Sequence, residues 1–226
     1  MGETATNAGP SVKILSCTPD PIFVISQAAG TCYGKHDLSE KRVFNCLRAG
    51  HESVFEHANA TFLIGDISRA CSHQLVRHRL ASYSQQSQRY CRIDVASDDW
   101  YVIPPDILGE QSELKPDVYR MLMKDYAWNY LAALENGCKP EDARYLLPEA
   151  CKTEIVVTMN VREFFHFLDT RVSHRAQWEI RRLAMAMRMC LAKHDGEWEQ
   201  LIGMYDRVRA EKDSPTPLIT PSSAIG

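Results

Sequence analysis

Short runs of β-branched and aromatic residues alternate along this chain with longer segments of helical period, and this alternation constrains the fold more than any other feature. Neither an internal repeat nor a linker-like stretch interrupts the middle of the chain. The pattern therefore predicts a single domain of the α/β (α+β) class, in which a mixed sheet packs against long helices. The expected strands cover residues 12–17, 22–25, 61–65, 100–103 and 154–159.

Residues that start and stop helices bound the segments between these strands. Gly50 and Gly137 each follow a run of helical period, and Pro116 begins the longer of the two. Asn160 followed by Glu163 forms a capping box, which predicts that a helix starts at residue 161. The expected helices cover residues 38–49, 67–77, 116–136, 140–148, 161–172 and 180–191.

Composition favours a cytoplasmic globular protein. The chain has 226 residues, 45% of them apolar, which is enough for a sizeable core. No run reaches the roughly 18 apolar residues that span a bilayer, and the first residues lack the layout of an export signal. Residues 1–11 and 212–226 are rich in Ser, Thr, Pro and Gly and are expected to be tails flanking one domain over residues 12–211.

Neither the cysteines nor the histidines form a metal-binding pattern. The eight cysteines are dispersed and none belongs to a CxxC pair, which predicts reduced and mostly buried thiols. In the stretch HESVFEH, His51 and His57 are six residues apart, whereas a zinc protease helix needs histidines four apart. We therefore expect no metal site, and HESVFEH either packs structurally or forms the wall of a functional pocket.

Positive charge is concentrated between Asp66 and Asp94, where the chain has five arginines, no acid and no lysine. Because the net charge is −3, and −3 minus +5 is −8, the rest of the chain is strongly acidic. Exclusive use of arginine favours forked recognition of phosphate or carboxylate groups, and nearby Ser and Gln side chains add further donors. We expect a helix that runs into an irregular loop around a small phosphorylated ligand, although a basic surface loop with structural salt bridges would fit the same pattern.

A second polar cluster lies inside an aromatic stretch near the C-terminus, in NVREFFHFLDTRVSHRAQWEIR. Asn160, His166, Arg171 and Arg175 interrupt this apolar run, and Arg144 lies in a short segment between two prolines. Arginine among aromatic residues suggests a partly buried charge, which requires a partner from the protein or from a ligand.

Five sequence blocks together resemble the flavin-dependent thymidylate synthases. The signature of that family is Arg-His-Arg, seven residues and Ser, which here is Arg77-His78-Arg79, LASYSQQ and Ser87. GHESVFEH, RHRLASYSQQSQRY, YVIPP, ARYLLP and NVREFFHFLDTR…AQWEIR match the family blocks in order and spacing, over about residues 28–188.

The resemblance implies a fold of the thymidylate synthase-complementing type and a homotetramer whose active sites lie where subunits meet. It implies methylation of dUMP to dTMP, with methylenetetrahydrofolate as carbon donor, FAD as hydride carrier and NADPH as reductant, and no nucleic-acid or membrane partner. Carried over by position, the FAD-binding residues would be Ser53, Arg77, His78, Arg79 and Gln85, with Asn160, Arg162 and His166 of another chain. The dUMP-binding residues would be Gln74, Arg77, Gln85, Gln86, Ser87, Gln88, Arg89, Arg144 and Arg171.

The family chemistry accounts for the two residues expected to be catalytic. Arg171 would stabilise the negative charge that develops at the imide edge of the uracil ring, and His51 would lie near the flavin ring. No cysteine follows a proline here, which disfavours the ordinary thymidylate synthase and its cysteine nucleophile.

The sequence departs from the family pattern in places, and other functions stay open. Gln85 stands where some members carry Glu, Cys32 stands where many carry Ser, and His174 lies one place earlier than the family histidine, so no role is assigned to it or to Arg175. The alternatives are a related flavoenzyme that modifies carbon 5 of another pyrimidine nucleotide and a nucleic-acid-binding protein that uses the arginine-rich loop.

Overall fold

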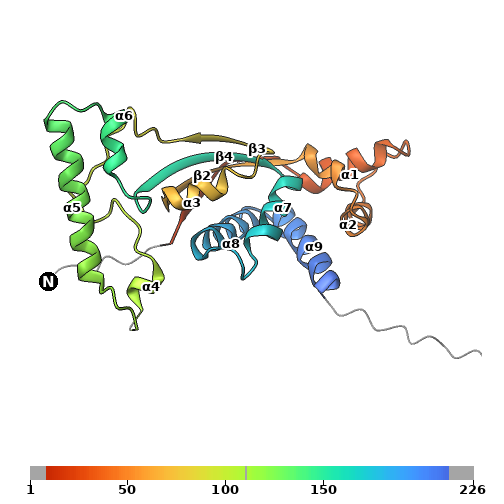
Figure 1. Cartoon of the computed structure of the whole chain (residues 1–226). Coiled ribbons are helices and arrows are strands. Elements are labelled where there is room, and N and C mark those ends of the chain that lie inside the picture. Colours follow the sequence, from red (N-terminus) through yellow and green to blue (C-terminus); the bar gives the residue numbers. More distant parts are fainter. Residues whose placement is uncertain (1–8, 110, 214–226) are drawn as a thin grey trace, which may run out of the picture.

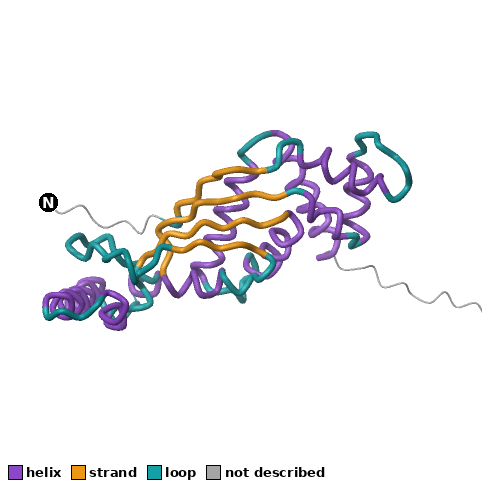
Figure 2. The backbone as a smooth tube through the Cα atoms, turned by 90° about the horizontal axis from the view of Figure 1, so that it is seen from above, coloured by secondary structure: helices purple, strands orange, loops and turns teal. Residues whose placement is uncertain are grey.

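A four-stranded antiparallel sheet forms the centre of the molecule in a computed structural model that describes residues 9–109 and 111–213. The strands are β1 (Ser11–Cys17), β2 (Asn59–Ser68), β3 (Ala81–Gln85) and β4 (Lys152–Asn160). They lie side by side in the order β1-β2-β4-β3, and Val157 of the central β4 pairs with Phe62 and with Tyr83 (Figure 2). All three pairings are antiparallel, so the expectation of a mixed sheet was wrong.

Helices cover one face of this sheet. Alternate residues of β2 and β4, such as Phe62 and Val157, are fully buried against them. Figure 1 shows these covering helices on one side of the strands, and in Figure 2 the strands lie in front of them. The covering helices are α3 (Arg69–Leu75), α7 (Val161–Arg171), α8 (Trp178–Ala192) and α9 (Gly196–Asp213).

The remaining elements lie at the two ends of the sheet (Figure 1). At one end, α5 packs Tyr119 and Met123 against Trp100, Tyr101 and Cys151 in a second apolar cluster. The elements at that end are α4 (Pro105–Leu108), α5 (Pro116–Glu135), α6 (Pro140–Ala143) and the 3-10 helix η2 (Arg144–Leu146). The elements at the other end are α1 (Pro21–Thr31), α2 (Glu40–Ala49) and the 3-10 helix η1 (Glu52–His57).

Helix boundaries follow the capping signals. Gly50 ends α2 with φ of 75°, a conformation that glycine adopts without strain, and Gly137 follows α5 with φ of 84°. The side chain of Asn160 accepts a hydrogen bond from the backbone N–H of Glu163 at 2.9 Å and so caps α7. The helices expected from residues 38, 116, 161 and 180 are confirmed with small shifts at their ends.

Several sequence expectations were wrong. Residues 22–25 belong to α1, because Ile22, Ile25, Ser26 and Ala29 are buried at helical spacing. Residues 100–103 stay outside the sheet and form only the isolated bridge between Tyr101 and Cys151. The arginine-rich segment is not simply a helix followed by an irregular loop, because α3 is shorter than expected and β3 follows it.

All eight cysteines are free, but two are buried, two are exposed and four are half-buried, so the expectation that most are buried was wrong.

Residues 1–8 and 214–226 of the expected tails lie outside the described residues, while α9 extends to Asp213. Among the described residues no helix is both long and apolar enough to cross a membrane.

Candidate active site

The arginine-rich segment turns between α3 and β3 and lines a cavity of about 720 Å³. Residues 77–80 form this turn, and the other walls come from η1, α7 and α9. The phenol oxygen of Tyr83 lies 2.8 Å from the carbonyl oxygens of both Leu75 and His78, and its single proton is donated to one of them. Tyr83, which sequence reasoning missed, therefore holds the turn against the sheet.

His78 is buried at the inner end of this turn, with an exposed fraction of 5%. Its Nε2 accepts a hydrogen bond of 3.0 Å from Nε of Arg171. Its Nδ1 lies 3.3 Å from the carboxylate of Glu163, without the angle of a good hydrogen bond. Burial, and then the charges of Arg171 and His166, lower the pKa of His78 to about 4, so the ring is neutral at pH 7.

Arg171 lies at the C-terminal end of α7 and reaches back to the turn. Besides its bond to His78, its Nη2 donates to the carbonyl oxygen of Gln74 at 3.2 Å. Its Nη1 forms no hydrogen bond with any described residue. The side chain expected to act on the nucleotide is thus fixed at two nitrogens and keeps a third available.

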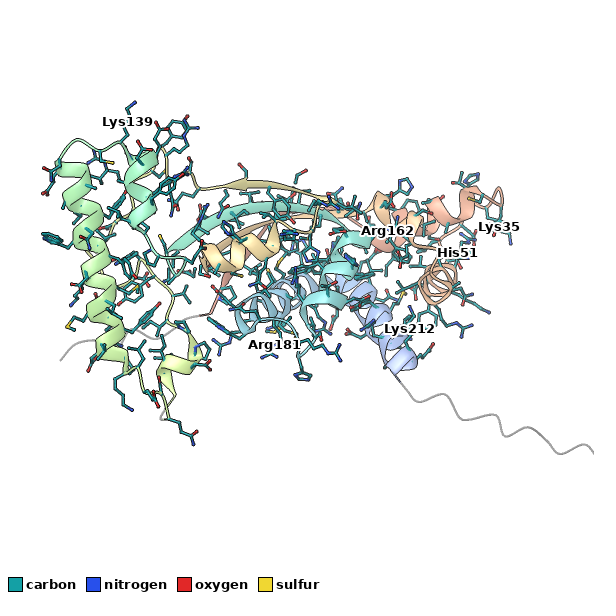
Figure 3. The ribbon with its side chains drawn as sticks, in the orientation of Figure 1. Lys35, His51, Lys139, Arg162, Arg181 and Lys212 are labelled. Carbon is teal, nitrogen blue, oxygen red and sulfur yellow. The ribbon has the colours of Figure 1, made fainter. Side chains whose placement is uncertain are left out.

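The N-terminal half of α7 brings further predicted residues to the same cavity. Arg162 bonds the carboxylates of Glu52 and Glu56 in η1 at 3.2 and 2.5 Å, and Figure 3 shows Arg162 at the end of the sheet where α1, α2 and α9 lie. The ring of His166 lies 5.7 Å from that of His78, centroid to centroid. Arg162 and His166 line the cavity together with residues 77–79 of the same chain, whereas the family resemblance predicts that they reach a flavin from another chain.

Four of the expected flavin-site residues do not line this cavity: His51, Ser53, Gln85 and Asn160, the last of which caps α7 just outside it. Ser53 belongs to η1 and His51 immediately precedes it, and both are exposed beside residues that do line the cavity. Gln85 points elsewhere, because its Nε2 donates to Ser72 at 2.9 Å and to Thr153 at 3.1 Å between α3 and β4.

Helix α9 supplies a wall of the cavity that sequence reasoning missed. Tyr205, Arg209 and Lys212 line it from this helix. Asp169 of α7 accepts hydrogen bonds from Tyr205 at 2.5 Å and forms an ion pair with Arg209 at 3.2 Å, and these contacts join the two helices. The helical spacing of buried residues such as Leu201, Tyr205 and Val208 was the available signal.

A second cavity of about 420 Å³ lies near the other end of α3. Gln88 and Arg144, both expected to bind the nucleotide, line it. Arg69 and His73 of α3 line it as well, and neither was singled out for this purpose from the sequence. Two arginines in a small polar cavity suit a phosphate group.

Four other expected nucleotide-binding residues, Gln74, Gln86, Ser87 and Arg89, line neither cavity. Gln74 follows His73 on α3, and its side chain contacts Gln177 at 3.5 Å. Gln86 and Ser87 continue from β3, and Gln86 is exposed. Arg89 forms an ion pair with Glu141 at 3.1 Å, so its charge is partly compensated within the chain.

The larger cavity fits a flavin dinucleotide. Its volume of about 720 Å³ falls within the usual range of about 300–1,000 Å³ for ligand pockets. Phe55, Leu80, Phe165 and Val208 offer apolar surface for a ring system. Arg77, Arg79 and Lys212 line the same cavity, and their cations form no ion pair with a described residue. A ligand with a flat ring system and a negatively charged diphosphate would contact both the apolar surface and these unpaired cations.

Comparison with known proteins agrees with this geometry. A family model described as thymidylate synthase complementing protein matches residues 13–195. The chain is 43% identical over 187 residues to a flavin-dependent thymidylate synthase of Geobacter sulfurreducens, covering 78% of this chain and 79% of that protein. It is 45% identical over 196 residues to the protein of that name from Pyrococcus furiosus, covering 81% and 80%. The cavity residues of α9 lie beyond the matched family segment.

Proposed function

The chain belongs to the thymidylate synthase complementing protein family, and we propose that it acts as a flavin-dependent thymidylate synthase. It transfers a methyl group to dUMP to form dTMP, with methylenetetrahydrofolate as carbon donor and NADPH as reductant. FAD is the cofactor and supplies hydride transfer when bound. The proposed single catalytic domain covers residues 12–211 together with the end of α9, which supplies Lys212 to the cavity, and the expected cytoplasmic location stays a prediction.

The cofactor is assigned to the larger cavity. Arg77 and Arg79 line the cavity with unpaired charges for the diphosphate. Asn160, Arg162 and His166 contribute from the start of α7, and Ser53 and His51 contribute from the segment around η1.

The nucleotide is assigned to the region between the two cavities. Gln88 and Arg144 hold its phosphate in the smaller cavity, and Gln74, Gln85, Gln86, Ser87 and Arg89 complete the contacts. Arg171 faces the uracil ring, where its permanent positive charge stabilises the negative charge that develops during reaction at carbon 5. The observation that carries the proposal is that Arg171 links the two cavities. It bonds His78, which lines the larger cavity, and the backbone of Gln74, which follows Arg69 and His73 of the smaller cavity on α3.

The active form is proposed to be a homotetramer. The face of the sheet away from the helices keeps Leu63, Val156 and Thr158 only half-buried within one chain. On α5, Met121 and Trp128 are exposed by 59% and 70%. Such apolar surface supports packing against other copies of the chain.

The test is anaerobic turnover of the purified flavoprotein with dUMP, methylenetetrahydrofolate and NADPH, with identification of the nucleotide product. We expect dTMP, and we expect Arg171→Ala to keep its FAD but to lose tritium release from carbon-5-labelled dUMP. Arg120→Ala is the control, because this residue pairs with Asp117 on α5 away from both cavities. A preparation that takes up no FAD, or that turns over another pyrimidine nucleotide instead, would disprove the assignment.

A further inference from the structure

A buried carboxylate faces the histidine of the arginine-histidine-arginine turn. The side chains of Glu163 and His78 are each only 4% exposed, and Oε1 of Glu163 lies 3.3 Å from Nδ1 of His78. Glu163 belongs to the first turn of α7 and lines the larger cavity with His78. A buried acid at such a position requires a compensating donor or charge.

The hydrogen bonds determine where the proton of His78 lies. Arginine nitrogens only donate, so the bond from Nε of Arg171 requires a lone pair on Nε2 of His78. A neutral ring with that lone pair carries its proton on Nδ1, which is the nitrogen that faces Glu163. Arg171, His78 and Glu163 therefore form a row of a cation, a neutral ring and a carboxylate, in which the ring and the carboxylate are buried and the guanidinium is half-buried.

We propose that Glu163 is a positioning residue for Arg171: it keeps the proton of His78 on Nδ1, so that Nε2 accepts from Arg171 and fixes the guanidinium toward the nucleotide. The inference rests on the proposed function, since that function gives Arg171 its role. Without the carboxylate, no negative charge would face the proton on the Nδ1 side. Movement of the proton to Nε2 would then set two N–H donors against each other and release Arg171.

The role of the carboxylate is separable from the role of Glu163 in the helix. Its backbone N–H is bonded to Asn160 in the cap of α7, and this bond does not depend on the side chain. Replacing the side chain alone therefore leaves the cap in place. The second ring nitrogen of His78, Nε2, already holds Arg171, so the ring cannot satisfy both neighbours in any other tautomer.

The experiment measures the tautomer directly and the reaction separately. Nitrogen-15 NMR of histidine-labelled flavoprotein at pH 7 reports which ring nitrogen of His78 carries the proton, with His78→Phe used to assign the signal. We expect Nδ1–H in the wild type and in Glu163→Gln, whose amide oxygen still faces Nδ1. In Glu163→Leu we expect loss of the Nδ1–H form and a fall in kcat for dUMP of up to about 100-fold, with FAD content unchanged.

Glu199→Leu is the matched control, because Glu199 is also an acid in the first turn of a helix but lies outside both cavities, and it should change neither readout. A wild-type ring protonated on Nε2 would overturn the proposal without any variant, and so would unchanged tautomer and kcat in Glu163→Leu. If the wild type makes no dTMP but Glu163→Leu still shifts the proton, the proposed function fails and the proton placement by Glu163 stands.

Discussion

Asn160 is predicted to have two separable tasks, because only one end of its side chain is bonded within the chain and the other is left for the proposed flavin contact. Its Oδ1 accepts the backbone N–H of Glu163 at 2.9 Å, and its amide nitrogen has no hydrogen bond with a described residue. Asn160→Ala removes both groups. Asn160→Ser keeps an oxygen that can cap the helix but removes the amide donor that would reach the flavin.

The expected magnitudes follow from these contacts. Loss of an N-cap lowers the free energy of unfolding by about 0.5–2 kcal/mol. Loss of one neutral hydrogen bond to FAD costs about 0.5–1.5 kcal/mol, which weakens its binding by about two- to tenfold. Asn160→Ala should therefore lose both stability and FAD affinity, whereas Asn160→Ser should lose only affinity.

Urea unfolding of the FAD-free protein at one fixed protein concentration measures stability, and quenching of flavin fluorescence measures affinity. Ser39→Ala is the control, because Ser39 caps α2 by accepting from the N–H of Arg42 at 3.3 Å. It should lower stability and leave FAD affinity unchanged. If Asn160→Ser binds FAD as tightly as the wild type, the amide is not a flavin ligand and the reasoning fails.

Three further predictions follow from burial and charge. The pKa of His78 is about 4 in the folded protein and about 6.5 in the unfolded chain. As pH drops, the unfolded chain therefore takes up the proton first, and the free energy of unfolding should fall by about 3 kcal/mol between pH 6.5 and pH 4. His78→Gln should flatten that part of the pH profile in urea unfolding, and parallel profiles would contradict the assignment. Arg144→Gln should weaken dUMP binding by about 10- to 100-fold in equilibrium dialysis without loss of FAD, whereas Arg120→Gln should change neither. Phe62→Ala should lower the free energy of unfolding by about 3–5 kcal/mol, because this fully buried ring stacks on Phe164 at a centroid distance of 5.9 Å. A loss below about 1 kcal/mol would contradict the packing of α7 on the sheet.

The sequence predicts those strands whose apolar residues alternate, and it misses the strand whose residues are polar. β1, β2 and β4 carry β-branched and aromatic side chains toward the helices. β3 is ASYSQ, and its serines face the uncovered side of the sheet, so nothing in its apolar pattern distinguishes it from a loop. The strand forms because β4 supplies a hydrogen-bonding edge for it. Since β4 lies about seventy residues later in the chain, the local sequence of β3 cannot reveal this pairing.

The site was predictable to the extent that motifs mark it. Arg77, His78, Arg79, Arg162 and His166 were expected together and line one cavity. The wall from α9 was not expected, because nothing local links a C-terminal helix to a turn more than a hundred residues earlier. The sequence also did not predict which acids lie beside these basic residues. Glu163, which faces His78, belongs to α7, and Glu141, which pairs with Arg89, belongs to α6.

The division of the nucleotide residues between two cavities gives a test of the proposed tetramer. Arg144 lines the smaller cavity, whereas Arg171 reaches the larger one through His78, although both are assigned to one dUMP molecule. If each active site takes these arginines from different subunits, mixed tetramers of Arg144→Gln and Arg171→Ala contain some sites with both arginines intact. Random assembly of equal amounts should restore roughly a quarter of wild-type turnover, because each of the two positions is intact half of the time. If both arginines of a site come from one subunit, every site in the mixture lacks one of them and no activity returns.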